Sequence, residues 1–256
     1  MRWQTIYLTY ITKSDSSKPS MLWQTKKKFS FQELEKLFDE IFLKIDRSKS
    51  RFEVFKDFVT CSACALRNSL SGISKNLVVQ SLEDEYHKIM AKYSKEDKSN
   101  IHHLFGLLIA MMEARALPHD VLGDLYMRFE FGSSHNGQHF TPTHISNLLA
   151  VMNSGQIPEL IKQKGYVSCV DPACGAGSTL LAKVKCVIDG GFNPAKHLYM
   201  EGTDIDRLVA LMCYVQLSLW NVPGRVFVGD SLTLKMREMW ITPAYVHGAW
   251  YRKLNH

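Results

Sequence analysis

Apolar residues recur at helical spacing through the first half of the chain. After Ser30, leucine, phenylalanine and isoleucine return every three or four positions, which is the period of one helix face. Ser30-Phe31-Gln32-Glu33 also fits a capping box, in which the Ser30 and Glu33 side chains satisfy free N–H groups at a helix start. Further helices are predicted over residues 51–69, 82–93, 101–116 and 120–129. This half is therefore expected to be helical.

The hydrophobic period changes after Gly165. Before this change, Thr141-Pro142 begins one more helix, which runs to about Met152. Thr can cap a helix, and Pro is tolerated in its first turn. Strands are then predicted over residues 166–171, 198–203 and 225–229, and the helices between them over residues 178–188 and 206–219. Such alternation is typical of a parallel sheet with right-handed crossovers.

The predicted fold class is α/β, with a helical N-terminal domain followed by a shortened Rossmann-like sheet. We expect a poorly ordered extension at 1–29, the helical domain at 30–135, and the sheet with an aromatic C-terminal tail at 136–256. Hydrophobic residues make up 46% of the 256 residues, which is enough for a sizeable core.

Composition narrows the class of protein. The net charge of +6 is compatible with a nucleic-acid partner but is weak evidence for one. No apolar run reaches the roughly 18 residues of a membrane helix, so we expect a cytoplasmic protein without a membrane partner. Cys61 and Cys64 form a C-x-x-C without a second pair of ligands, and we interpret them as apolar residues on a helix face rather than as a metal site.

A glycine-rich turn follows the first predicted strand and opens a helix. Its sequence is Asp171-Pro172-Ala173-Cys174-Gly175-Ala176-Gly177. Small residues let a ligand approach the backbone, and a helix start offers unpaired N–H groups to an anionic group such as a carboxylate or phosphate. The spacing is neither G-x-G-x-x-G nor that of a P-loop, which disfavours a dinucleotide or a nucleoside triphosphate.

Acidic residues end the next two strands. Asp204 stands where nucleotide-binding sheets hold ribose hydroxyls, whereas Asp206 is expected to cap the following helix. Asp230 ends the third strand and could accept a hydrogen bond from an exocyclic amine. Together with Asp171 and the glycine turn, these residues predict a nucleoside-containing cofactor, the alternative being three separate caps or turns.

Residues 171–177 resemble the D-P-A-C-G-[SA]-G motif of adenine-N6 DNA methyltransferases, above all the modification subunits of type I restriction systems. Residues 137–142 resemble that family's G-[QE]-[FY]-[FY]-T-P segment, although His139 departs at the first aromatic position. The helical first half is also similar. The resemblance covers residues 30–230.

The resemblance implies S-adenosylmethionine as the cofactor, DNA as a partner and adenine N6 as the methyl acceptor. The cofactor-binding residues that it implies are Thr141, Asp171, Ala173, Gly175, Gly177, Asp204 and Asp230.

The family's catalytic tetrapeptide [DN]-P-P-[FY] does not occur in this sequence. Asn221-Val222-Pro223-Gly224 and Thr242-Pro243-Ala244-Tyr245 come nearest, and we interpret them as a loop and part of the tail. The catalytic residues therefore stay unknown, and two functions stay open. One is a methyltransferase of the type I modification class. The other is a non-catalytic accessory, regulatory or decoy subunit that binds the cofactor.

The strand at 166–171 is expected to have an open edge, because the sheet of the resembling family continues beyond it. Exposed apolar edges are normally covered. Either the aromatic tail at 236–254 or another chain could cover this one. We expect association, as a homodimer or with a second subunit.

Overall fold

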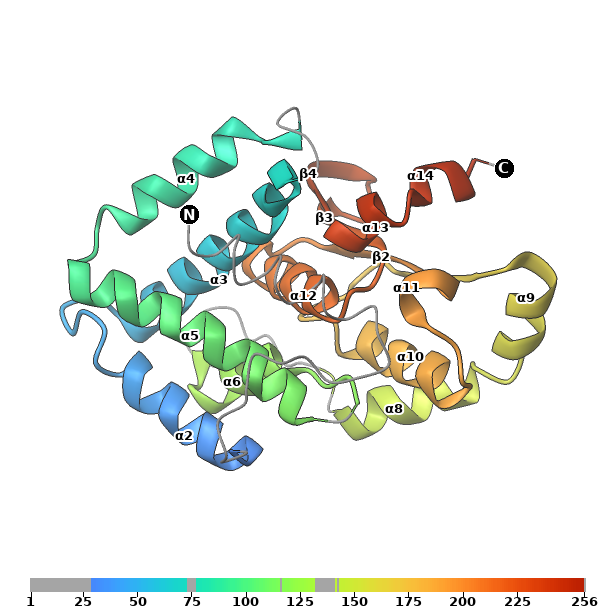
Figure 1. The fold of residues 1–256 in the computed structure, drawn as a ribbon, viewed down its shortest axis with the longest axis horizontal. Coiled ribbons are helices and arrows are strands. Elements are labelled where there is room, and N and C mark those ends of the chain that lie inside the picture. Colours follow the sequence, from blue (N-terminus) through green and yellow to red (C-terminus); the bar gives the residue numbers. More distant parts are fainter. Residues whose placement is uncertain (1–28, 73–76, 116, 132–140, 142, 256) are drawn as a thin grey trace. The chain divides into compact units, whose positions relative to one another are not determined.

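The computed structural model describes residues 29–72, 77–115, 117–131, 141 and 143–255 (Figure 1). The chain divides into two compact units, Met1–Ala116 and Leu117–His256. This division lies before the boundary predicted at residue 135, because helix α6 (Val121–Arg128) packs on α12 (Arg207–Leu219) of the second unit.

Helices build the described part of the first unit, as the apolar period predicts. They are α2 (Phe31–Phe42), α3 (Arg51–Asn68), the short 3₁₀ helix η2 (Ser69–Gly72), α4 (Gln80–Met90) and α5 (Lys95–Ala114). The capping box at the start of α2 is present, with Glu33 N donating to Ser30 Oγ at 3.3 Å and Ser30 N to Glu33 Oε2 at 2.8 Å.

The first unit encloses an aromatic core. Helix α2 packs on α5, and α3 packs on α4. Phe38 meets Phe58 edge-on at 5.8 Å between ring centroids, and all atoms of both side chains are buried. Cys61 and Cys64 lie buried on α3, as expected for small apolar residues.

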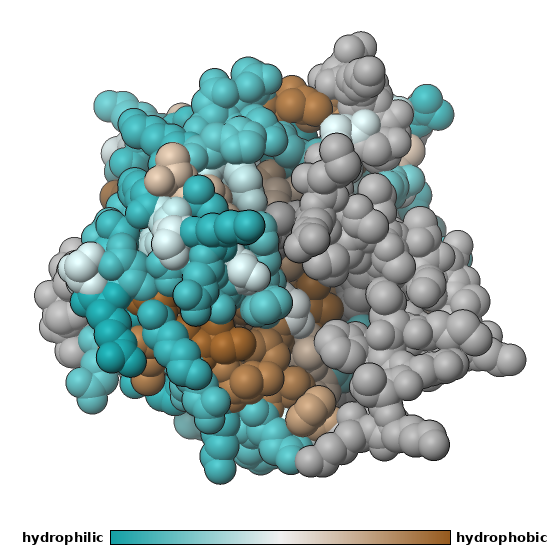
Figure 2. Space-filling model, turned by 60° about the vertical axis from the view of Figure 1, so that its left-hand side comes forward, coloured by the Kyte–Doolittle hydropathy of each residue, from teal (hydrophilic) through white to brown (hydrophobic). Residues whose placement is uncertain are grey.

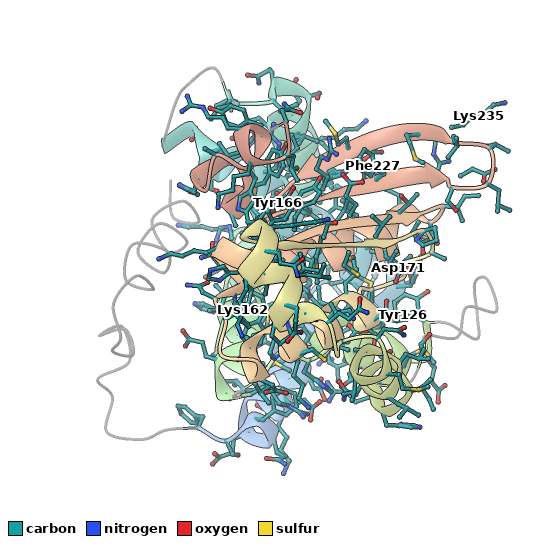
Figure 3. All side chains as sticks on the ribbon, turned by 90° about the vertical axis from the view of Figure 1, so that its right-hand side faces the viewer. Tyr126, Lys162, Tyr166, Asp171, Phe227 and Lys235 are labelled. Atoms are coloured by element: carbon teal, nitrogen blue, oxygen red, sulfur yellow. The ribbon has the colours of Figure 1, made fainter. Side chains whose placement is uncertain are left out.

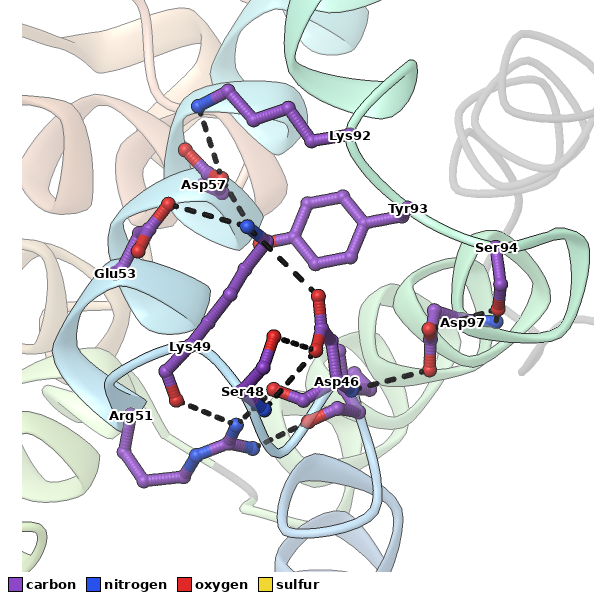
Figure 4. A network of polar contacts seen from close by, with 11 residues as sticks. Asp46, Ser48, Lys49, Arg51, Glu53, Asp57, Lys92, Tyr93, Ser94 and Asp97 are labelled. Atoms are coloured by element: carbon purple, nitrogen blue, oxygen red, sulfur yellow. Dashed lines mark hydrogen bonds and ion pairs between the residues drawn. The ribbon is translucent and has the colours of Figure 1, made fainter.

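A polar network stabilises the turn between α2 and α3 (Figure 4). The Arg51 guanidinium donates to the carbonyl oxygen of Phe42, the last residue of α2, at 2.9 Å and to that of Ile45 in the following turn at 2.7 Å. The buried Asp57 carboxylate accepts a hydrogen bond from the Tyr93 hydroxyl at 2.9 Å and pairs with Lys92 at 3.5 Å.

The second unit is built around a four-stranded sheet in the order β1-β2-β3-β4. Its strands are β1 (Val167–Asp171), β2 (Leu198–Asp204), β3 (Gly224–Asp230) and β4 (Lys235–Ile241). The first three are parallel, as predicted, and β4 pairs antiparallel with β3. Its other helices are α8 (Thr143–Met152), α9 (Ile157–Lys164), α10 (Ser178–Asp189), α11 (Pro194–His197), α13 (Pro243–His247) and α14 (Trp250–Lys253).

One face of the sheet is buried beneath helices. Helix α10 packs on β1 and β2, and α12 packs on β2 and β3. Because the strands follow one another in space, right-handed crossovers put both helices on the same face. On the other face Val170 of β1 is 65% exposed, and Arg225 Nε donates to Glu201 at 2.9 Å.

The expectation of three strands was wrong. Residues Met236–Ile241 lie in β4, which extends the sheet beyond β3 instead of covering β1. The rest of the tail turns back to the amino ends of the strands. There the fully buried Trp250 stacks on Tyr199 of β2 at 6.0 Å and meets Tyr166 edge-on at 5.4 Å.

Within the described residues, no helix is both long and apolar enough to cross a membrane. Polar side chains cover much of the surface in the view of Figure 2, with an apolar patch between them.

Candidate functional site

The glycine-rich turn is fixed to the carboxyl end of the sheet by its own hydrogen bonds. Asp171 ends β1, and its carboxylate accepts from Ala173 N at 3.0 Å and from the Thr179 hydroxyl. Cys174 N donates to the Thr203 carbonyl at 2.9 Å, which attaches the turn to β2. Figure 3 shows Asp171 at one end of the sheet and Tyr166 at the other.

Two glycines of the turn adopt left-handed backbone conformations. The φ angles are 52° at Gly175 and 98° at Gly177. A Cβ on Gly177 would stand 2.9 Å from the Cys213 sulfur of α12, so glycine is required there for packing as well as for conformation.

Helix α10 begins directly after the turn and has no side-chain cap. Its N-cap residue is Gly177, which has no side chain to bond the first N–H groups. These N–H groups and the positive end of the helix dipole are therefore available to an anionic ligand group, as the sequence predicted.

Helix α8 is tied to the start of α10. The Ser178 hydroxyl donates to Ser146 Oγ at 2.9 Å, and Lys183 Nζ donates to the Asn153 carbonyl at 2.9 Å beyond the end of α8. These bonds position Thr141, which precedes α8. Of the other residues in the predicted segment 137–142, none lies among the described residues.

Asp204 joins the tip of β2 to the glycine turn. Its two oxygens accept from Gly175 N and Asp206 N, both at 2.9 Å. Burial raises the pKa of the Asp204 carboxyl, although these two bonds oppose the shift. Asp206 caps α12 as predicted, accepting from Leu208 N at 2.7 Å.

Asp230 forms a turn at the end of β3. Its Oδ1 accepts from Leu232 N at 2.9 Å and from Thr233 N at 3.2 Å, where the chain turns back into β4. Hydrogen bonds from Thr233 and Leu232 lower the pKa of the Asp230 carboxyl, so it is held as a carboxylate.

Gln216 of α12 connects the turn to the start of α6. Its Nε2 donates to Ala176 O at 2.9 Å and to Asp120 Oδ1 at 2.8 Å, and its Oε1 accepts from Leu122 N at 3.1 Å. The Gln216 side chain is fully buried. Neither Gln216 nor Asp120 belongs to the motifs recognised in the sequence.

A cavity of about 180 Å³ lies over the glycine turn. Its described lining comprises Asp120, Thr141, Ala173, Cys174, Gly175, Ala176, Ser178, Thr179, Asp204 and Val209. Four of the predicted cofactor residues are in this lining, namely Thr141, Ala173, Gly175 and Asp204. Asp171, Gly177 and Asp230 are not in it. Asp171 bonds Ala173 N and Thr179, Gly177 lies against Cys213, and Asp230 bonds its own loop.

The charge of this lining is negative. Asp120 and Asp204 are in it, whereas no Lys, Arg or His is among the described residues that line it. A nucleotide phosphate would therefore meet carboxylates without a balancing side-chain cation, and the cavity suits a ligand that carries positive charge.

The tetrapeptides nearest to [DN]-P-P-[FY] lie at the opposite end of the sheet. Gly224 begins β3, and Thr242 follows the last residue of β4, which pairs with Arg225. The Thr242 hydroxyl donates to Val222 O at 2.8 Å and accepts from Gly224 N at 2.9 Å. Both segments thus lie away from the glycine turn, and Pro243 to Tyr245 belong to α13.

A family model described as N-6 DNA Methylase matches residues 118–246, half of the chain. The chain belongs to the N-6 DNA methylase family. The match runs from just before Asp120 into α13, so it contains the four described strands and the described lining of the cavity.

Two curated relatives are type I restriction enzyme methylase subunits of Methanocaldococcus jannaschii. The MjaVIII subunit is 27% identical over 145 residues, which are 55% of this chain and 23% of the relative. The MjaVII subunit is 24% identical over 128 residues, which are 47% of this chain and 20% of the relative. The matched segment thus spans less than a quarter of either relative's length.

One solved structure with a similar chain trace is a candidate class I S-adenosylmethionine-dependent methyltransferase from Listeria monocytogenes. The TM-score is 0.41 at 20% identity, over 79% of this chain and 54% of that one.

S-adenosylmethionine is the cofactor that membership of this family implies, and the cavity fits it chemically. The cofactor carries a positive sulfonium and a positive ammonium group beside one carboxylate. The negative lining residues suit the positive groups, and the uncapped start of α10 suits the carboxylate.

Proposed function

We propose that this chain binds S-adenosylmethionine at the glycine turn and serves adenine-N6 methylation of DNA in a restriction-modification system. The observation that carries the proposal is the negatively lined cavity over the uncapped start of α10, in a chain of the N-6 DNA methylase family. The names of the curated relatives supply the restriction-modification context.

The proposed contacts to the ribose and the carboxylate follow from the lining of the cavity, and the contact to the adenine moiety follows from the resemblance of the sequence to the family. Asp204 would accept hydrogen bonds from the ribose hydroxyls with the lone pairs that its two backbone partners leave open. The first N–H groups of α10 would hold the carboxylate, beside Thr141 and Ala173. Asp230 would accept from the exocyclic amine of the adenine moiety. When bound, the cofactor supplies an electrophilic methyl group on its sulfonium.

A second candidate function is a cofactor-binding subunit without catalysis of its own. The observation that favours it is the position of both near-matches to the catalytic tetrapeptide at the far end of the sheet. Transfer of tritiated methyl from the cofactor to DNA by the purified chain distinguishes the two functions. Label in DNA supports a methyltransferase. Cofactor binding without label supports the non-catalytic subunit.

Replacing Asp204 tests the cofactor site directly. We expect Asp204→Ala to weaken S-adenosylmethionine binding by about 1.5–3 kcal/mol, the range for hydrogen bonds to a charged group. Isothermal titration calorimetry measures the dissociation constant. Asp189→Ala, at the exposed far end of α10, is the matched control and should bind like the unchanged chain. An unaltered dissociation constant in Asp204→Ala would assign Asp204 to the turn alone.

We further propose that the chain associates through the β1 edge, as a homodimer or with a second subunit. Within the described residues β1 pairs only with β2, and its Val170 is 65% exposed. Light scattering at micromolar concentration and co-purification should show a species above 29.3 kDa. We expect Val170→Lys to weaken this association. A monomer in both experiments would refute it. DNA contact and a cytoplasmic location stay predictions.

A further inference from the structure

Asp120 is a buried carboxylate in the cavity lining, and the described hydrogen bonds use only one of its two oxygens. It caps α6, and its Oδ1 accepts from Gly123 N and from Gln216 Nε2, both at 2.8 Å. The residue is 4% exposed and lines the cavity. Among the described contacts, none of the hydrogen bonds goes to Oδ2.

A helix cap alone does not require this residue. Capping needs one acceptor oxygen, which Ser, Thr or Asn supplies without charge. Asp120 instead carries a carboxylate into a buried position, where burial raises the pKa of its carboxyl. Such a group is costly unless a positive charge approaches it.

Among the residues that the structure describes, no cation forms an ion pair with Asp120. His119 lies beside it in sequence, but its Nε2 bonds the Asp124 carboxylate at 2.5 Å. The other ionisable group in the described lining with a resolved pKa shift is Asp204, which is also acidic. Across the turn, Asp171 adds a further carboxylate, and the Cys213 thiol on α12 is kept neutral because its pKa is raised.

The position of Asp120 relative to α10 indicates which ligand group it meets. Gln216 Nε2 bonds both Asp120 Oδ1 and Ala176 O, so the carboxylate is coupled to the turn residue two positions before α10 begins. An amino-acid carboxylate held at the start of α10 carries its ammonium group on the adjacent carbon. The cavity therefore presents a positive helix end beside a negative side chain, which is complementary to an amino-acid zwitterion.

We propose that Asp120 binds the α-ammonium group of the cofactor's methionine moiety through Oδ2. This inference rests on the proposed cofactor site and adds a ligand outside the recognised motifs. Gln216 is the positioning residue that holds Asp120 against the turn.

Three ligands and two variants test the assignment by calorimetry. S-adenosylmethionine and S-adenosylhomocysteine both carry the ammonium group, whereas 5′-deoxy-5′-methylthioadenosine lacks the amino-acid moiety. Asp120→Asn keeps an Oδ1 acceptor for Gly123 N and Gln216 Nε2, removes the charge and replaces the Oδ2 acceptor by an amide NH2 donor. Asp124→Asn removes a charge from the same helix outside the lining and is the matched control. Thermal melting of each variant monitors folding.

We expect Asp120→Asn to weaken both amino-acid ligands roughly 10- to 100-fold, the range for a hydrogen bond between charged groups. Methylthioadenosine should bind Asp120→Asn and the unchanged chain alike, and Asp124→Asn should bind all three ligands normally. A loss for S-adenosylmethionine alone would assign Asp120 to the sulfonium and overturn the inference.

Equal losses for all three ligands, or no loss, would leave Asp120 as a cap only and would also overturn it. The proposed cofactor site itself fails in a different way, since the unchanged chain would then bind none of the three ligands. That result would remove the inference as well.

Discussion

Replacing Gln216 by Leu should destabilise the second unit strongly, although the two side chains have similar volume. Gln216 makes three hydrogen bonds from a fully buried position, to Ala176 O, Asp120 Oδ1 and Leu122 N. Leucine fills the space between α12, the glycine turn and α6 but offers no donor or acceptor. The substitution therefore isolates the polar contribution of this connection.

The expected size follows from the partners left behind. Asp120 Oδ1 keeps its hydrogen bond from Gly123 N, so losing the bond from Gln216 costs little free energy at this atom. Ala176 O and Leu122 N lose the bonds that Gln216 gives them in a buried region. Each unsatisfied backbone group costs about 1–3 kcal/mol. We expect the free energy of unfolding to fall by about 2–6 kcal/mol, two such groups together.

Urea denaturation of the full chain, followed by circular dichroism, measures this change. Gln156→Leu is the matched control, because Gln156 is exposed and its side chain makes no capping bond to α9. Its effect should stay within about 0.5 kcal/mol, as for most surface substitutions. A Gln216→Leu variant as stable as this control would refute the idea that the three bonds hold the turn in place.

Two further predictions concern packing around the sheet. Gly177→Ala should destabilise the chain by about 2–4 kcal/mol, because its Cβ would lie 2.9 Å from Cys213 Sγ and its φ of 98° is left-handed. The control Gly155→Ala, at an exposed position, should be nearly neutral in the same urea titration. Trp250→Ala should lower the free energy of unfolding by about 3–5 kcal/mol in thermal melting, because the ring is fully buried against Tyr166 and Tyr199. The control Tyr251→Ala removes an exposed ring and should lower it by less than about 1 kcal/mol. Equal effects within either pair would contradict the packing described.

Strong local patterns made most elements predictable. The capping box at Ser30, the apolar stripe of α2 and the alternation of buried strands with helices each depend on neighbouring residues, and all are present. Strand β4 was missed because Lys235, Arg237 and Glu238 interrupt its apolar pattern. It is an edge strand, so its pairing with β3 determines its structure more than burial does.

The candidate site was predictable where its residues lie at the ends of predicted strands. The turn at residues 171–177, Asp204 and the Asp206 cap follow from the strand–turn–helix order, and the structure brings the turn and Asp204 together. Asp120 and Gln216 lie 96 positions apart in sequence and meet only in the folded unit. An isolated acid before a short helix gave no signal beyond a cap.

Part of the exposed apolar surface of the second unit lies at the carboxyl end of the sheet. Trp250 packs against Tyr166 and Tyr199 at the amino ends of β1 and β2. At the carboxyl ends, by contrast, Val170, Ile205 and Leu232 are exposed, each within two residues of the aspartate that ends its strand. Leu232 is 95% exposed in the turn that Asp230 forms. A partner that covers these residues would border the cofactor cavity as well. Because coupling between two ligands is reciprocal, a partner that tightens cofactor binding must itself bind more tightly when the cofactor is present. Titrating S-adenosylhomocysteine with and without the partner would measure this coupling, and identical dissociation constants would show that the two surfaces act independently.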